Sequence, residues 1–81
     1  MNLANQLYDA DCIQFGTFTL KSGLESPVYV DLRLLASHPS LLRDVAREMA
    51  VSAGELTFDR IGAIPLAGLP IGTALALEMN K

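Results

Sequence analysis

Apolar residues at the start of the chain follow a helical spacing. Leu3, Leu7, Ala10 and Ile13 recur every three or four positions, which places them on one face of a helix. Further along, apolar and polar residues take turns in "FGTFTLKSG" and again in "VYVDLR". Such alternation is typical of strands with one apolar and one polar face. The pattern therefore predicts a helix over residues 2–13, followed by two strands.

The two predicted strands are joined by "SGLESP", a connection longer than the two-residue turns that hairpins prefer. One face of the pair is apolar and consists of Phe18, Leu20, Val28, Val30 and Leu32. The other face is polar and carries Thr17, Thr19, Lys21, Tyr29, Asp31 and Arg33. We expect a hairpin-like pair with one apolar face and one face that carries polar and charged side chains able to bind a ligand.

The clearest helix lies in "SHPSLLRDVAREMAVSAGEL". Ser37 or His38 is a suitable N-cap, Pro39 suits the first turn, and Gly54 is a plausible stop. One apolar stripe runs through the segment and comprises Leu41, Leu42, Val45, Ala46, Met49 and Ala50. The start of the helix explains His38, the only histidine, without metal binding or acid–base work, since metal sites need several ligands.

The remainder of the chain predicts a strand, a turn and another helix. "FDRIGAIP" is short and lacks polar alternation, as a buried parallel strand does, and "LAGLPIGTALALEM" follows as turn and helix. Helix, strand and helix in this order open a doubly wound parallel sheet. The predicted class is therefore α/β.

Composition changes this picture in one respect. The 81 residues are 51% hydrophobic, with a mean hydropathy of +0.33, which is high for so small a domain. Such a composition predicts an unfinished core or a large partner interface. The last segment, "IGTALALEMNK", stops in mid-helix with no glycine or proline after it. We expect the chain to be the front part of a larger domain.

Charge and cysteine content exclude several classes of function. A net charge of −3 and a pI near 4.8 argue against a general nucleic-acid binder. Cys12, the single cysteine, cannot form an internal disulfide, suits a reducing compartment, and is expected to be a small buried hydrophobe. No secretory signal is found. The uncharged residues 61–77 are short for a membrane-spanning helix and are interrupted by proline and glycine. We expect a cytoplasmic protein that spans no membrane.

Two places could bind an anion. The turn "PLAGLPIG" leads from a predicted strand into a helix, where ligands of α/β sheets bind. It matches neither a P-loop nor a dinucleotide fingerprint, and a purely structural turn is at least as good an interpretation.

The second place is the hairpin. Lys21 beside Ser22 and Gly23 combines a flexible cation with hydroxyl and backbone donors, and Tyr29 offers a surface on which a planar ring could stack. Asp31 and Arg33 could simply pair with each other. From these residues alone, ligand binding and a merely solvated polar face remain equally good interpretations.

The order of three motifs resembles the N-terminal part of orotate phosphoribosyltransferase, in the form found in bifunctional UMP synthases. The motifs are "FGTFTLKSGLESPVYVDLR", "SHPSLL" and "FDRIGAIPLAGLPIGTALAL", and the resemblance covers about residues 7–77. It implies a type I phosphoribosyltransferase fold. Residues 1–36 would form the hood and hairpin segment, and residues 37–81 the start of the core α/β sheet.

The resemblance also implies a reaction and a set of binding residues. The family transfers ribose 5-phosphate from phosphoribosyl pyrophosphate (PRPP) to orotate, giving orotidine 5'-phosphate and pyrophosphate, with Mg²⁺ on the pyrophosphate. Lys21 matches the lysine that meets PRPP, and Tyr29 and Val30 match the pair that flanks the orotate ring. Leu66 and Ala67 match the loop that wraps the pyrophosphate. Some relatives carry a tyrosine and a lysine at these two positions, so here we expect backbone contacts, together with Gly68, to serve. A regular strand would point Tyr29 and Val30 in opposite directions, so we expect a bend or a backbone contact there.

The sequence departs from the family's pattern in what it lacks. These 81 residues hold no adjacent acidic pair, and the only lysines are Lys21 and Lys81, so the family's acidic PRPP motif and its mobile lysine loop are missing. We expect no catalytic residue and no metal ligand on this chain, and no turnover by the chain alone. The resemblance also implies that the full-length protein forms a homodimer. The alternative function is a non-catalytic binding or regulatory module of the same fold.

Overall fold

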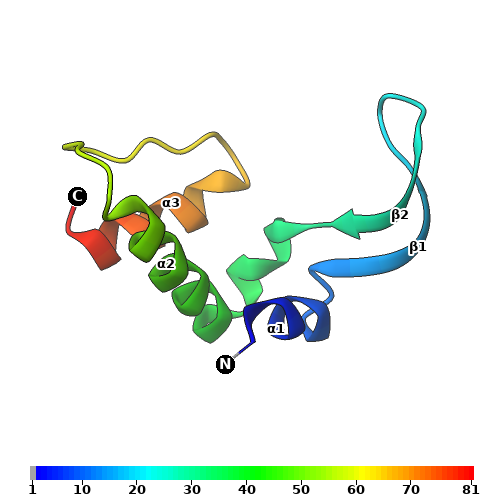
Figure 1. Ribbon diagram of the computed structural model, residues 1–81, viewed down its shortest axis with the longest axis horizontal. Helices are drawn as coiled ribbons and strands as arrows, with labels where there is room; N and C mark the ends of the chain where they lie inside the picture. The colour runs from blue at the N-terminus through cyan, green and yellow to red at the C-terminus, as the bar shows by residue number, and fades with distance from the viewer. Residues whose placement is uncertain (1) are drawn as a thin grey trace.

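The computed structural model describes residues 2–81 and consists of one hairpin and a group of helices (Figure 1). The elements in chain order are α1 (Leu3–Asp9), β1 (Ile13–Thr19), β2 (Glu25–Val30), the 3-10 helix η1 (Leu32–Ser37), α2 (Pro39–Ala53) and α3 (Gly68–Met79). The hairpin curves away from the helices, and a long segment without helix or strand joins α2 to α3 (Figure 1).

The hydrophobic core lies where α2 packs against α1, η1 and α3. Cys12 and Leu35 are completely buried there, next to Leu41 and Val45 on α2. Cys12 is thus a buried apolar side chain, as expected from its residue type. Because η1 contributes Leu35 directly after the hairpin, the core fixes the point from which the hairpin departs.

The α2 helix confirms the periodic pattern of the sequence. His38 is its N-cap residue without a side-chain capping bond, Pro39 occupies the first turn, and Gly54 is the C-cap. The buried positions Leu41, Val45 and Ala46 belong to the predicted stripe, whereas Met49 is 40% exposed. The α1 helix is shorter than predicted: it ends at Asp9, and Ile13 already belongs to β1. The chain reverses direction in between, at Asp11, whose φ of 64° lies in the left-handed region.

The hairpin is present, but its faces and ends differ from the prediction. Its register is regular from Ile13 to Phe15 and then shifts before Phe18, as at a β-bulge. The Phe18 ring, expected on the dry face, stacks on the ring of Tyr29 from the polar face, with the centroids 5.5 Å apart. The bulge therefore breaks the simple alternation into two separate faces.

The predicted parallel strand over residues 58–65 is the main correction. This segment is not a strand, and the sheet in residues 2–81 contains only the antiparallel pair β1 and β2. A strand requires a hydrogen-bonded neighbour, and none lies beside this segment. Ile64 is 83% exposed as a result. The segment is held against α3 by a close approach of Ala63 to Gly72, where an added Cβ would lie 2.5 Å from the Ala63 Cβ.

Many large apolar side chains outside the core are exposed. The most exposed of them are Ile64, Leu66, Leu77, Val51, Phe15, Leu24 and Leu56. The incomplete core expected from the composition is thus visible on the hairpin, on the segment before α3 and on the outer sides of α2 and α3. No helix among residues 2–81 is long and apolar enough to cross a membrane.

Candidate functional site

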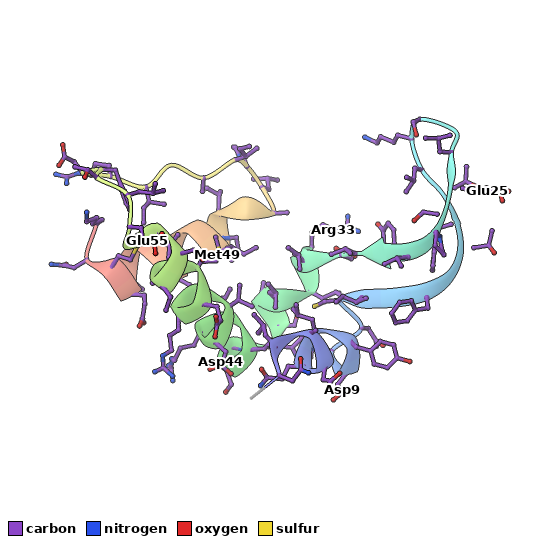
Figure 2. The ribbon with its side chains drawn as sticks, viewed as in Figure 1. Asp9, Glu25, Arg33, Asp44, Met49 and Glu55 are labelled. Atoms are coloured by element: carbon purple, nitrogen blue, oxygen red, sulfur yellow. The ribbon has the colours of Figure 1, made fainter. Side chains whose placement is uncertain are left out.

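An open pocket of about 400 Å³ lies where β2 passes into η1 and where α3 begins. Two stretches far apart in the sequence form its walls. The first wall consists of Tyr29, Val30, Asp31, Leu32 and Arg33, and the second of Ala67, Gly68 and Ile71. In Figure 2 the Arg33 side chain rises from the junction of β2 and η1, on the side toward which the hairpin curves.

The junction of β2 and η1 is shaped by Asp31. Its carboxylate Oδ1 accepts the backbone N–H of Arg33 at 3.1 Å, and it is the N-cap residue of η1. Its own N–H donates to the carbonyl oxygen of buried Cys12 at 2.7 Å. The strand ends at Val30, three residues before the alternation ends at Arg33, because the Asp31 side chain caps η1 and so favours a helix start over continuation of the ladder.

Asp31 and Arg33 also form a two-point ion pair. Arg33 Nε donates to Asp31 Oδ1 at 2.8 Å, and Nη2 donates to Oδ2 at 2.9 Å. The hydrogen bond from Arg33 is the main reason why the pKa of the Asp31 carboxyl is lowered, and the same bond raises the pKa of Arg33. The pairing expected from their spacing is confirmed, although Arg33 lies on η1 and not on a strand.

Tyr29 and Val30 both line the pocket, although neighbours on a regular strand point to opposite sides. The strand ends at Val30 and turns into η1 at this point, which supplies the predicted bend. The Tyr29 ring stacks against the Phe18 ring, as described above. Val30 is 54% exposed, so its side chain is available at the pocket rim.

Two of the six predicted binding residues do not line this pocket. Lys21 lies in the turn at the hairpin tip, between β1 and β2. The Gly23 N–H closes this turn by donating to the Leu20 carbonyl at 2.9 Å. Gly23 has a φ of 87°, a conformation that suits glycine. Leu66, on the second wall's loop, is 82% exposed. The structure thus brings Tyr29, Val30, Ala67 and Gly68 together and leaves Lys21 and Leu66 outside.

Two pocket residues had no predicted role. Leu32 was expected on the dry face of a strand, and it reaches the pocket only because η1 begins there. Ile71 lies one helical turn after Gly68, and this spacing was the available signal in the sequence.

Other chemically interesting residues lie elsewhere. His38 borders a separate open cavity of about 490 Å³ between α1 and α2, with Gln6, Asp9 and Asp44. Burial raises the pKa of the Cys12 thiol, and the neighbouring Asp31 and Asp11 add to the effect, which keeps the thiol protonated and unreactive. Within residues 2–81 no three His, Cys, Asp or Glu side chains gather closely enough to hold a metal ion.

No family model matches the chain. The orotate phosphoribosyltransferase of Archaeoglobus fulgidus is 39% identical over 79 residues, which are 98% of this chain and 44% of the relative. The uridine 5'-monophosphate synthase of Bos taurus is 45% identical over 74 residues, which are 89% of this chain and 15% of the relative. The chain is homologous to part of orotate phosphoribosyltransferase.

The solved structures lead to the same family. The structure of Leishmania donovani UMP synthase superimposes with a TM-score of 0.91 and 51% identity, over 96% of this chain and 18% of that chain. The predicted α/β class and type I phosphoribosyltransferase fold are therefore confirmed, with the sheet incomplete. The chain spans less than half the length of these orotate phosphoribosyltransferase and UMP synthase relatives.

Proposed function

We propose that the complete protein is an orotate phosphoribosyltransferase, which transfers ribose 5-phosphate from PRPP to orotate in UMP synthesis. The observation that supports this most directly is the convergence of Tyr29 and Val30 with Ala67 and Gly68 around one pocket. By the resemblance of the motifs, Tyr29 and Val30 match residues that flank the ring, and Ala67 with Gly68 matches the loop that wraps the pyrophosphate. Orotate and PRPP would then be bound in one pocket, as formation of the bond between the orotate ring and the ribose requires.

The pocket suits the two ligand parts for different physical reasons. Tyr29 offers an aromatic edge and Val30 an apolar surface to a planar ring. Ala67 and Gly68 have no bulky side chains, so a pyrophosphate could approach the backbone N–H groups at the start of α3. Lys21 would meet PRPP from the hairpin tip, which requires the hairpin or the ligand to bridge the distance to the pocket.

Mg²⁺ belongs to this proposal as a companion of the PRPP pyrophosphate. The donor set of residues 2–81 does not fit a metal cage of its own, because no cluster of carboxylates or imidazoles forms. Phosphate oxygens would supply the ligands that Mg²⁺ prefers. A cytoplasmic homodimer completes the proposal. The 81-residue chain by itself would not turn over orotate, since it contains no adjacent acidic pair.

A non-catalytic binding or regulatory module is the second candidate. The observation in its favour is that the pocket can be built from this chain while the acidic motif cannot. The two functions differ in one measurement: formation of orotidine 5'-phosphate by the complete product of the gene that encodes this chain.

Replacement of Lys21 by alanine tests the proposed binding of PRPP. Removing a cation that contacts a phosphate typically loses a charge-assisted hydrogen bond, so we expect PRPP affinity in the complete gene product to fall about tenfold or more. Isothermal titration with PRPP and Mg²⁺ measures this. Lys81→Ala is the matched control, because Lys81 binds the Phe58 carbonyl at the far end of α3. An unchanged PRPP affinity in Lys21→Ala would remove Lys21 from the site.

A further inference from the structure

We propose that Arg33 is a specificity-determining residue that binds an oxyanion of the ligand with the edge of its guanidinium that Asp31 leaves free. This inference rests on the proposed function and adds a residue to it. It concerns the first wall of the pocket, where Arg33 is the only basic side chain.

The arrangement of donors on Arg33 supports the proposal. A guanidinium carries five N–H donors. Asp31 accepts one from Nε and one from Nη2. Nη1 makes no hydrogen bond within residues 2–81, so the edge formed by Nη1 and the second Nη2 proton remains open. This edge matches the spacing of two oxygens in a carboxylate or phosphate.

The exposure of the two partners is unequal in a way that suits this role. The Asp31 side chain is 14% exposed, whereas the Arg33 side chain is 67% exposed. Asp31 is additionally bonded to the backbone on both sides, through the Cys12 carbonyl and the Arg33 N–H. Asp31 therefore acts as a fixed clamp on the inner edge of Arg33, and the outer edge faces solvent at the pocket.

A surface ion pair with only a structural role is the competing explanation. Surface pairs of this kind contribute little to stability, and a structural role needs only the Asp31 carboxylate as the cap of η1. The pocket wall gives the free edge a further use. Its other side chains, apart from Asp31 and the Tyr29 phenol, are apolar or absent: Val30, Leu32, Ala67, Gly68 and Ile71. An anionic ligand in the pocket would find its strongest hydrogen-bond donors on Arg33.

The oxyanion has two possible sources in the proposed reaction. One is the carboxylate of orotate, and the other is a phosphate group of PRPP. Both accept two parallel N–H bonds, so the geometry of Arg33 fits either. Lysine keeps the charge but cannot form the fork, and for this reason Arg33→Lys separates the fork from the charge.

The experiment uses the complete gene product and titrates the parent, Arg33→Lys and Arg33→Gln separately with orotate and with PRPP and Mg²⁺. Arg60→Lys is the matched control, because within residues 2–81 the side chain of Arg60 bonds only the carbonyl oxygen of its neighbour Asp59. Circular dichroism and thermal unfolding identify which of the two variants folds like the parent. We expect the affinity for one ligand to fall about tenfold, while the affinity for the other stays within about twofold.

Each result has one meaning. A loss confined to orotate assigns Arg33 to the carboxylate, and a loss confined to PRPP assigns it to a phosphate. Three results overturn the proposal in favour of a structural pair: an equal loss of affinity for both ligands, no loss of affinity for either, or failure of both variants to fold. If the parent itself binds neither ligand, the proposed function fails first, and the role of Arg33 fails with it.

Discussion

The two walls of the pocket are supported very differently. The first wall, residues 29–33, is attached to the core through the Asp31 N–H bond to Cys12 and through η1, which carries the fully buried Leu35. The second wall begins in the segment before α3, where Ile64 and Leu66 are more than four-fifths exposed. The supports of this segment include the Gly68 N–H bond to the Ile64 carbonyl, at 3.1 Å, and the Leu69 N–H bond to the Leu66 carbonyl, at 3.2 Å. Ala63 also lies close to Gly72.

This difference separates what the chain can organise alone from what needs more surface. The first wall is determined by contacts within residues 2–81, so its shape is set before any ligand arrives. Ile71 of the second wall packs against the core, but the segment that leads into this wall has little buried area of its own, and segments of this kind open at a low free energy. A ligand that bridges the two walls would therefore order mainly the second.

The largest expected effect comes from truncating the support of the first wall. Leu35→Ala removes a completely buried side chain and should lower the free energy of unfolding by about 2–5 kcal/mol. The matched substitution in the segment before the second wall, Ile64→Ala, should change it by less than about 0.5 kcal/mol, because Ile64 is exposed. Urea unfolding followed by circular dichroism measures both. Equal effects of the two substitutions would contradict the comparison.

A smaller effect is expected where the second wall touches α3. In Gly72→Ala the new Cβ would meet the Ala63 Cβ at 2.5 Å, and the weakly supported segment should move away. The clash and the better helix propensity of alanine then offset each other, so stability should change by at most about 1 kcal/mol. Proteolysis within residues 58–66 should become several times faster.

Gly62→Ala is the control for this experiment, because nothing lies within 4 Å of an added Cβ there. If Gly72→Ala instead destabilised the whole domain by more than about 3 kcal/mol, at the upper end for overpacking of a core, the second wall would be as firmly supported as the first.

The smallest effect concerns the acid dependence of the first wall. The folded-state pKa of Asp31 is lowered from 3.8, chiefly by its hydrogen bond with Arg33. The ionised carboxylate therefore favours the folded state above pH 3.8, and this contribution is lost as the pH falls further, through the lowered pKa. Melting temperatures should fall more steeply below about pH 4 in the parent than in Asp31→Asn. Asp59→Asn serves as control and should keep the steepness of the parent.

Local sequence patterns correctly predicted the elements that are determined by residues close together in the chain. The stripe on α2 and Pro39 at its start specify that helix without reference to the rest of the chain. The end of β2 was mispredicted by three residues, because Asp31 continues the polar alternation while its side chain caps η1. The apolar residues of segment 58–65 suggest a buried strand when the segment is considered alone. A strand also needs a hydrogen-bonded neighbour, and this segment has none within residues 2–81.

The candidate site shows the same division. Asp31 and Arg33 were paired correctly from a spacing of two residues. The meeting of residues 29–33 with residues 67–71 could not be predicted from spacing, because it results from the packing of α3 against η1. The proposed ligands rest on the resemblance of the motifs and not on the physical pattern.

Cys12 offers a way to observe this junction directly. It is the only thiol in the chain, it is completely buried, and its carbonyl oxygen accepts the Asp31 N–H. A thiol reagent can react with it only when the core opens beside the start of η1. The labelling rate of Cys12 therefore reports how often the first wall opens, and it needs no engineered probe. Movements of the hairpin tip or of the segment before α3 would leave the labelling rate of Cys12 unchanged.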